Sequence, residues 1–96
     1  MKYLEDWTKI LTIAIKSSEN FVKYNGEIFE FRVFEFLKHK KGYIVIWNRR
    51  TRHAFNVSIK IEESIKSKII RLEDSNLNDN DSEIPSDLIF SNNSKP

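Results

Sequence analysis

The chain of 96 residues contains no cysteine, two glycines and two prolines. Without cysteine it can form no disulfide, zinc–thiolate site or iron–sulfur cluster, and it has no thiol nucleophile. Two glycines cannot build a glycine-rich phosphate-binding loop, and two histidines are too few for a histidine-only metal site. No apolar run approaches the roughly 20 residues of a membrane span. We therefore expect no cofactor, no metal and no membrane contact.

The N-terminal residues 1–7 carry acidic side chains where a signal peptide would place a basic and then an apolar stretch. We therefore expect a cytoplasmic protein. The abundance of Ile, Lys, Asn and Ser is typical of AT-rich genomes. This composition suggests a viral or plasmid origin, and a viral protein would lie inside the host cell.

Charge is divided unevenly along the chain. Residues 1–72 carry 15 basic and 8 acidic side chains, a net charge of +7. Residues 73–96 carry one basic and six acidic side chains, a net charge of −5. The polar run 74–83 has no hydrophobic period, which is typical of a weakly ordered segment. We predict a compact domain over residues 1–72 and an acidic, largely flexible tail over residues 73–96, with an apolar patch at 84–90.

Hydrophobic spacing predicts a helix, four strands and a second helix. Apolar residues at helical spacing begin at Leu4 and continue to residue 15, so the first helix ends near the polar residues 17–20. Alternating residues predict strands at 20–24, 27–37, 43–47 and 53–59. The dipeptide Asn25–Gly26 joins the first two, because it suits a type I′ hairpin turn. The second helix is predicted from an apolar stripe with steps of four, four and three, formed by Ile61, Ile65, Ile69 and Leu72.

These elements give an α+β fold. Its four-stranded antiparallel meander is preceded by one helix and followed by another, with the helices packed on one face of the sheet. In element order alone, a meander followed by a packing helix resembles the Whirly-type arrangement of single-strand-binding proteins. A folded part this small buries a modest core, so we also consider a homodimer.

The strongest functional signal is a basic stretch at residues 38–52, which contains no acidic residue. Its cations lie at the two ends of the strand predicted at 43–47. Lys and Arg at such positions neutralise phosphates and release counterions. The predicted phosphate contacts are Lys38, Lys40, Lys41, Arg49, Arg50 and Arg52.

The outer face of the same strands is rich in aromatic residues. If Ile44 and Ile46 point to the core, strand alternation places Tyr43 and Trp47 on the opposite face. Exposed rings of this kind accept bases of any sequence by stacking, and an Arg guanidinium can stack as well. The predicted stacking surfaces are Arg32, Phe34, Tyr43 and Trp47. In a second interpretation Phe34, Phe36 and Trp47 form another core beneath a helix or a dimer partner.

The apolar patch in the tail has three interpretations. The tail could fold back on the basic surface as an internal polyanion and compete with nucleic acid. The patch, with Ile84, Leu88, Ile89 and Phe90, could instead bind a partner protein, as acidic tails with apolar tips do in bacterial single-stranded DNA-binding proteins. Alternatively, these residues complete the core of this domain or of a dimer.

Together these patterns favour a non-enzymatic protein that binds nucleic acid, preferring single-stranded DNA or RNA with little sequence specificity. Glu30 faces away from Glu27 and Glu35 on one predicted strand, so we expect no catalytic carboxylate pair. One alternative is a protein-interaction module, an inhibitor or accessory factor that binds an acidic partner. Another is a duplex-RNA binder, whose elements also follow the order helix, strands, helix.

Overall fold

The computed structural model describes residues 4–36, 41–72 and 84–91 of the chain. An α+β fold in which a helix precedes a mostly antiparallel sheet is confirmed. Along the chain the elements are α1 (Leu4–Lys16), β1 (Phe21–Tyr24), β2 (Glu27–Phe36), β3 (Lys41–Asn48), β4 (His53–Lys60), the 3-10 helix η1 (Glu63–Lys68), β5 (Ile69–Leu72) and β6 (Ile89–Phe90).

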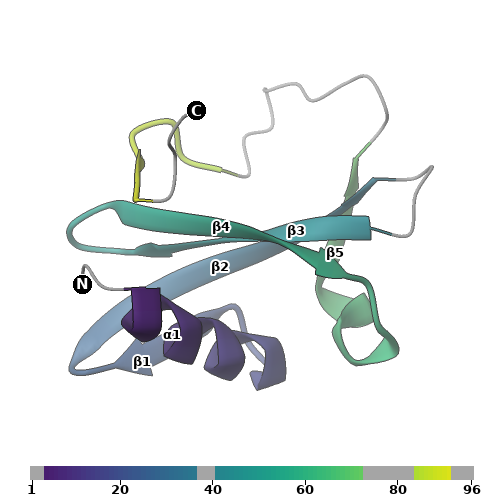
Figure 1. Cartoon of the computed structure of the whole chain (residues 1–96), viewed down its shortest axis with the longest axis horizontal. Coiled ribbons are helices and arrows are strands. Elements are labelled where there is room, and N and C mark those ends of the chain that lie inside the picture. The colour runs from purple at the N-terminus through teal and green to yellow at the C-terminus, as the bar shows by residue number, and fades with distance from the viewer. Residues whose placement is uncertain (1–3, 37–40, 73–83, 92–96) are drawn as a thin grey trace.

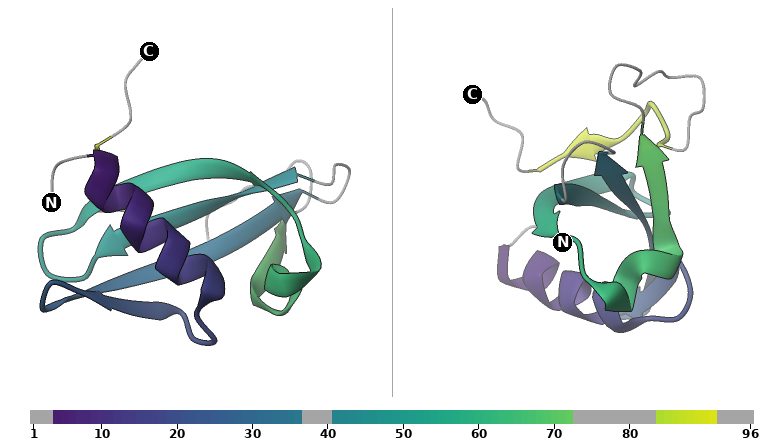
Figure 2. Two further views of the ribbon diagram at one scale, coloured as in Figure 1. Left: turned by 60° about the horizontal axis from the view of Figure 1, so that its bottom comes forward. Right: turned by 90° about the vertical axis from the view of Figure 1, so that its right-hand side faces the viewer.

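The sheet lies between α1 and residues 84–91 (Figures 1 and 2). Strands β1 to β4 form the predicted antiparallel meander, and β6 adds to β4 in parallel. Strand β5 pairs in parallel with the second half of β2, beyond the end of β1. We call residues 84–91 the tail segment, the sheet face under α1 the helix face, and the opposite face the tail face.

Helix α1 buries one stripe of side chains against the helix face. Trp7, Ile10 and Ala14, spaced three and four residues apart, are almost fully buried. The ring of Trp7 stacks on Phe55, with the ring centroids 5.4 Å apart, and meets Phe29 edge to face at 5.8 Å. Alternate residues of the strands supply the other side of this core, which contains the buried residues Phe29, Phe31, Val33, Ile44 and Ile46.

The turn between β1 and β2 follows the sequence prediction. Asn25 has a φ of 50° and Gly26 a φ of 77°, the positive values that a type I′ turn requires. The resulting register pairs Phe21 with Glu30 and Lys23 with Ile28. This short turn therefore decides which side chains of β1 lie on the tail face.

The predicted second helix at 61–72 is wrong. Its first part is the short 3-10 helix η1, and its second part is strand β5. Ile65 and Ile69 still pack against the helix-face core, as the prediction required. They do so from a 3-10 helix and a strand rather than from one α-helix. Residues 33–36 of β2 extend beyond β1, and β5 supplies the backbone partners for that free edge. β-branched Ile69 and Ile70 suit this strand.

In the part of the chain that the structure describes, η1 and β5 follow the meander in place of the packing helix on which the Whirly-type resemblance and the duplex-RNA alternative depend. Lys68 of η1 instead supports α1, since its Nζ donates to the carbonyl oxygens of Ala14 and Ile15 at 3.3 and 3.2 Å. These carbonyls belong to the last turn of α1, where Ala14 also accepts the backbone N–H of Ser17 at 3.2 Å.

Candidate functional site

The aromatic rings predicted to lie open on the tail face are covered. Phe34 and Trp47 do lie on that face, but their exposed fractions are only 2% and 1%. Tyr43 is half-buried and stacks on Phe34 at 5.2 Å between ring centroids. The expectation of uncovered rings is therefore wrong. This chain's own Ile70, Ile84, Leu88 and Phe90 pack against them.

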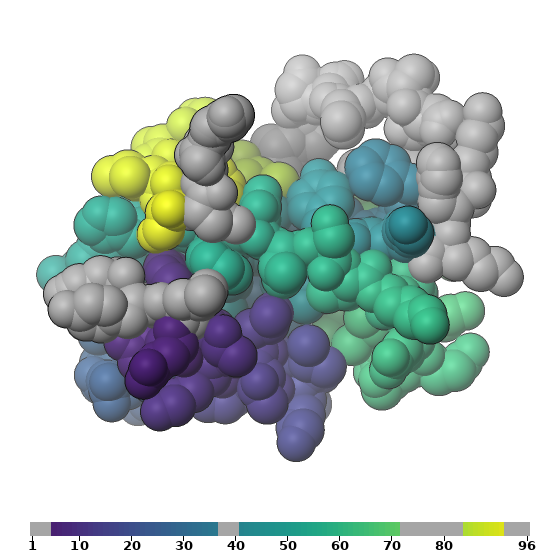
Figure 3. Space-filling view, viewed as in Figure 1, coloured from purple at the N-terminus to yellow at the C-terminus, as the bar shows by residue number. Residues whose placement is uncertain are grey.

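The tail segment rests on the sheet through a small number of contacts. Figure 3 shows it against β4, on the side of the sheet away from α1. The backbone N–H groups of Ile89 and Ser91 donate to the carbonyls of Arg52 and Ala54, each at 2.9 Å. Of the three interpretations of the apolar patch, the structure shows the one in which it completes the domain's own core, through Ile84, Leu88 and Phe90, whereas Ile89 is 54% exposed. Residues 84–91 of the predicted tail therefore lie against the sheet.

An ion pair also fastens the tail segment. Arg52 donates to both carboxylate oxygens of Asp87, from Nε at 2.9 Å and from a terminal nitrogen at 3.2 Å. These hydrogen bonds hold the pKa of Asp87 below its ordinary value and raise the pKa of Arg52. Arg52 has a φ of 68°, a left-handed conformation that is uncommon for residues other than glycine. Such strained positions concentrate where a side chain has a specific task.

The turn from β3 to β4 is built by Asn48, which is 2% exposed. Its side-chain oxygen accepts the backbone N–H groups of Arg50 and Thr51 at 2.7 and 3.0 Å. Its amide donates to Glu27, which also accepts a hydrogen bond from Arg50 at 3.0 Å. Asn48 thus fixes the backbone of the turn that carries three predicted phosphate-binding arginines. Of these, Arg50 turns toward Glu27 and Arg52 toward Asp87.

One part of the tail face remains open. The ring of Phe21 is 43% exposed, and the guanidinium carbon of Arg49 lies 5.4 Å from its centroid. Ile28 is 45% exposed, and its carbonyl accepts the N–H of Arg49. The register places Lys23 beside Ile28. We call this group the open corner; it consists of Phe21, Lys23, Ile28 and Arg49.

Sequence reasoning missed Phe21, Lys23 and Ile28. A signal was present, because the Asn25–Gly26 turn fixes the register that aligns Phe21 with Glu30 and Trp47 in one row across the sheet. Phe21 also flanks a polar, acidic connection rather than the basic stretch, so proximity along the chain did not suggest it.

Arg32 links the open corner to the covered rings. It pairs with Glu30 at 2.8 Å, and its guanidinium carbon lies 6.0 Å from the centroid of the Trp47 ring. Glu30 also lies 3.7 Å from Arg49. The Nε of Arg32 is buried without a hydrogen-bond partner. A chain of side-chain contacts therefore runs from the exposed part of the tail face to the part under the tail segment, through Arg49, Glu30, Arg32 and Trp47.

The other predicted basic residues lie away from this group. Lys41 is exposed at the beginning of β3, opposite Lys60, at the far end of the strand from Arg49. Lys38 and Lys40 fall outside the described residues. The structure thus places the turn arginines together and separates them from Lys41 by the length of β3, about 26 Å at about 3.3 Å per residue.

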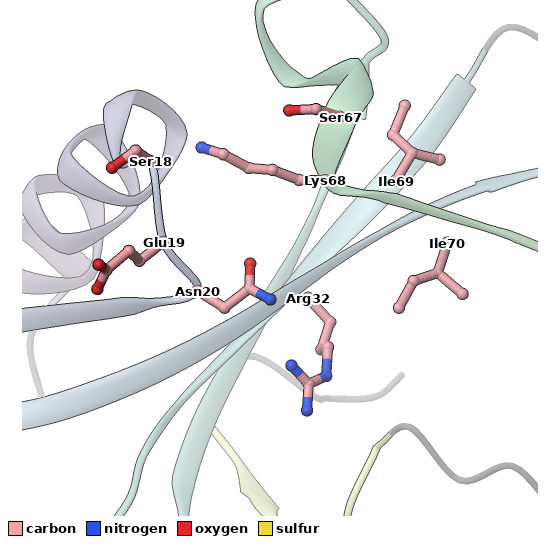
Figure 4. Close-up of a pocket in the computed structure, with 8 residues that line it drawn as sticks. All are labelled: Ser18, Glu19, Asn20, Arg32, Ser67, Lys68, Ile69 and Ile70. Atoms are coloured by element: carbon pink, nitrogen blue, oxygen red, sulfur yellow. The ribbon is translucent and has the colours of Figure 1, made fainter.

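A pocket of about 370 Å³ opens at the sheet edge between β1 and β5. Figure 4 shows its two cations, Lys68 and Arg32, extending in different directions. Lys68 reaches toward the end of α1 and lies over the Phe31 ring on the helix face, whereas Arg32 lies on the tail face. Because the cations do not converge, we assign no ligand to this pocket.

Comparison of the chain with protein-family models, curated proteins and solved structures gives no match. In the described ranges no helix is both long and apolar enough to cross a bilayer. Nor do three or more His, Asp or Glu side chains gather there as a metal ion would need.

Acidification is expected to loosen the tail segment. A carboxylate whose pKa is lowered by folding stabilises the folded state above its unfolded pKa, and this contribution is lost as the pH falls through the folded pKa. For Asp87 that loss lies below the ordinary value of 3.8. Acrylamide quenching of Trp47, in a Trp7→Phe background, should therefore increase in this range.

The control for this prediction is Asp87→Asn, which cannot ionise. In that variant quenching should already be raised at pH 7. The pKa of Glu27 is also lowered, chiefly because Asn48 donates to it, and Glu27 titrates in both proteins. Identical quenching profiles for the two proteins would show that Asp87 does not hold the segment.

Proposed function

We propose that this is a small, non-enzymatic protein that binds single-stranded nucleic acid with little sequence specificity. Binding uses the open corner and the turn from β3 to β4 that carries Arg49, Arg50 and Arg52, which we call the arginine turn. The observation that carries the proposal is the contact between Arg49 and the half-exposed ring of Phe21. The guanidinium of Arg49 lies over the ring of Phe21. A base could stack on the outer face of this guanidinium, whose edge can also bind a phosphate.

Charge supports this proposal. Lys23 is exposed, and the register places it on the same face as Phe21, so a strand stacked on the ring would have cations on two sides of it. Exposed rings favour single strands, because a duplex keeps its bases stacked inside. The acidic residues of this region, Glu27 and Glu30, are each in contact with an arginine.

Salt dependence tests the proposal. If Lys23 and Arg49 contact phosphates, the logarithm of affinity for oligo-dT should fall against the logarithm of salt with a slope near −1.4, and near −2 if Arg52 exchanges Asp87 for a phosphate. Contacts from Lys38, Lys40 and Lys41 would steepen the slope toward about −4. Duplex DNA of the same length at the same salt should bind more weakly. A slope near zero, or a preference for the duplex, would contradict the proposal.

One observation favours a second candidate function, a protein-interaction module. The tail face already holds a peptide segment, which pairs an acidic residue with Arg52 and places apolar side chains on the rings. A partner protein with an acidic, apolar segment would meet the same chemistry. Filter binding with oligo-dT separates the two candidates, because no measurable binding at low salt favours a protein target.

A further inference from the structure

The covered rings and the open corner belong to one continuous surface. The strand register aligns Phe21, Glu30, Trp47 and Ala54 across four strands. Arg32 joins the two parts, since it pairs with Glu30 and lies over Trp47. A strand of nucleic acid that stacks on Phe21 therefore has the tail segment directly in its path along the face.

We propose that Phe34, Tyr43 and Trp47 form a second base-stacking site, closed by the tail segment, and that a bound single strand displaces this segment. The inference rests on the proposed function. It adds a binding site that is hidden in the structure and names the group that occupies it.

The chemistry of Arg52 supports an exchange of partners. The fork of its guanidinium now binds the two oxygens of Asp87. A phosphate presents two oxygens in a similar arrangement, and bidentate pairing with either group is the geometry that arginine favours. Arg52 lies in the turn beside Arg49, so a backbone that contacts Arg49 can reach it. The carboxylate of the tail segment therefore occupies a place that suits a phosphate.

The tail segment is also fastened lightly. Strand β6 has two residues, and it pairs with β4 alone. Ile84, Leu88 and Phe90 are each partly exposed rather than buried. Segments with few buried contacts open more easily than the core of a domain. By contrast, Phe34 and Trp47 beneath them are almost fully buried, and Tyr43 is half-buried. Displacing the segment would uncover the aromatic surface formed by Phe34, Tyr43 and Trp47.

A reversible covalent lock tests this proposal in the full-length chain. His53 and Ile89 are register partners in the parallel β4–β6 pairing, and both side chains are exposed. The variant His53→Cys with Ile89→Cys would fasten the segment when oxidised and free it when reduced. The chain has no other cysteine, so no competing disulfide can form within it, and the wild-type protein has no thiol to oxidise. Trp7→Phe makes Trp47 the single tryptophan that reports on the covered site.

With oligo-dT as the probe, the reduced protein should bind about tenfold more tightly than the oxidised protein, the effect of losing one stacked base. Quenching of Trp47 by the oligonucleotide should occur in the reduced form only. Equal affinities, without quenching in either form, would overturn the inference and leave binding at the open corner intact. If neither form binds oligo-dT, the proposed function fails, and the inference fails with it.

Discussion

The variant in which Phe21, Lys23 and Arg49 are all replaced by alanine is expected to bind oligo-dT about a hundredfold more weakly at 0.1 M salt. Two lost phosphate contacts account for about 25-fold, because each contributes about 0.7 to the salt exponent. The lost stacking surface contributes the remainder, at about 1 kcal/mol. The salt slope should become shallower by about 1.4. Filter binding over a range of salt concentrations measures both quantities.

The chain offers a closely matched control on the other side of the molecule. Ile13 of α1 is 42% exposed, close to the 43% of Phe21, and the same helix carries the exposed Lys9 and Lys16. Replacing these three residues by alanine removes one exposed apolar side chain and two positive charges. The affinity should fall only slightly, through the lower net charge. Equal losses in the two variants would show that binding depends on overall charge rather than on the open corner.

Replacing Gly42 with alanine is expected to cost about 3 kcal/mol of folding free energy. Gly42 lies in β3, opposite Glu35 of β2, and a Cβ there would overlap the carbonyl oxygen of Phe34. It would also lie 2.8 Å from the end of the Ile61 side chain. The backbone oxygen cannot move away alone, so β2 must shift where Phe34 stacks on Tyr43. Urea unfolding of the variant measures the loss.

The comparison for this variant is Gly26→Ala. Nothing lies within 4 Å of a Cβ at Gly26, but its φ of 77° disfavours any other residue. The expected cost is about 1 kcal/mol, from backbone conformation alone. If Gly42→Ala were no more destabilising than Gly26→Ala, β2 and β3 would tolerate a wider separation. The stability of the fold would then not depend on their close pairing at Gly42.

The sequence predicts well those elements whose causes are local. The Asn25–Gly26 turn forms because those two residues accept positive φ, and the alternation in β2 to β4 places Phe31 and Ile46 in the core. Helix α1 follows from a stripe of apolar residues within one segment. In each case the residues that determine the structure are neighbours along the chain or lie across a short turn.

The sequence predicts poorly those features that depend on distant segments. The stripe from Ile61 to Leu72 has helical spacing, but its second half pairs with the free edge of β2 and is therefore a strand. Trp47 was assigned to the correct face, but its burial depends on Leu88 and Phe90, some forty residues later in the chain. Those residues follow an acidic run with no period, so no local pattern indicated where they would pack.

The arginine turn illustrates the same distinction at the candidate site. The run from Arg49 to Arg52 is visible in the sequence, but the partner of each side chain is not. Arg49 lies over Phe21, and Arg52 is held by Asp87. As a result, three arginines that look equivalent in the sequence have different environments, and we expect different consequences when each is replaced.

Mapping backbone amide chemical shifts by NMR during a titration with oligo-dT tests the central claim most directly, because it locates the contact on the full-length protein. We predict that the largest changes fall on Phe21 and Lys23 of β1 and on the turn from Arg49 to Arg52. Changes in the tail segment should follow, while the amides of α1 stay nearly constant. Changes centred on α1, or no changes anywhere at low salt, would contradict the account.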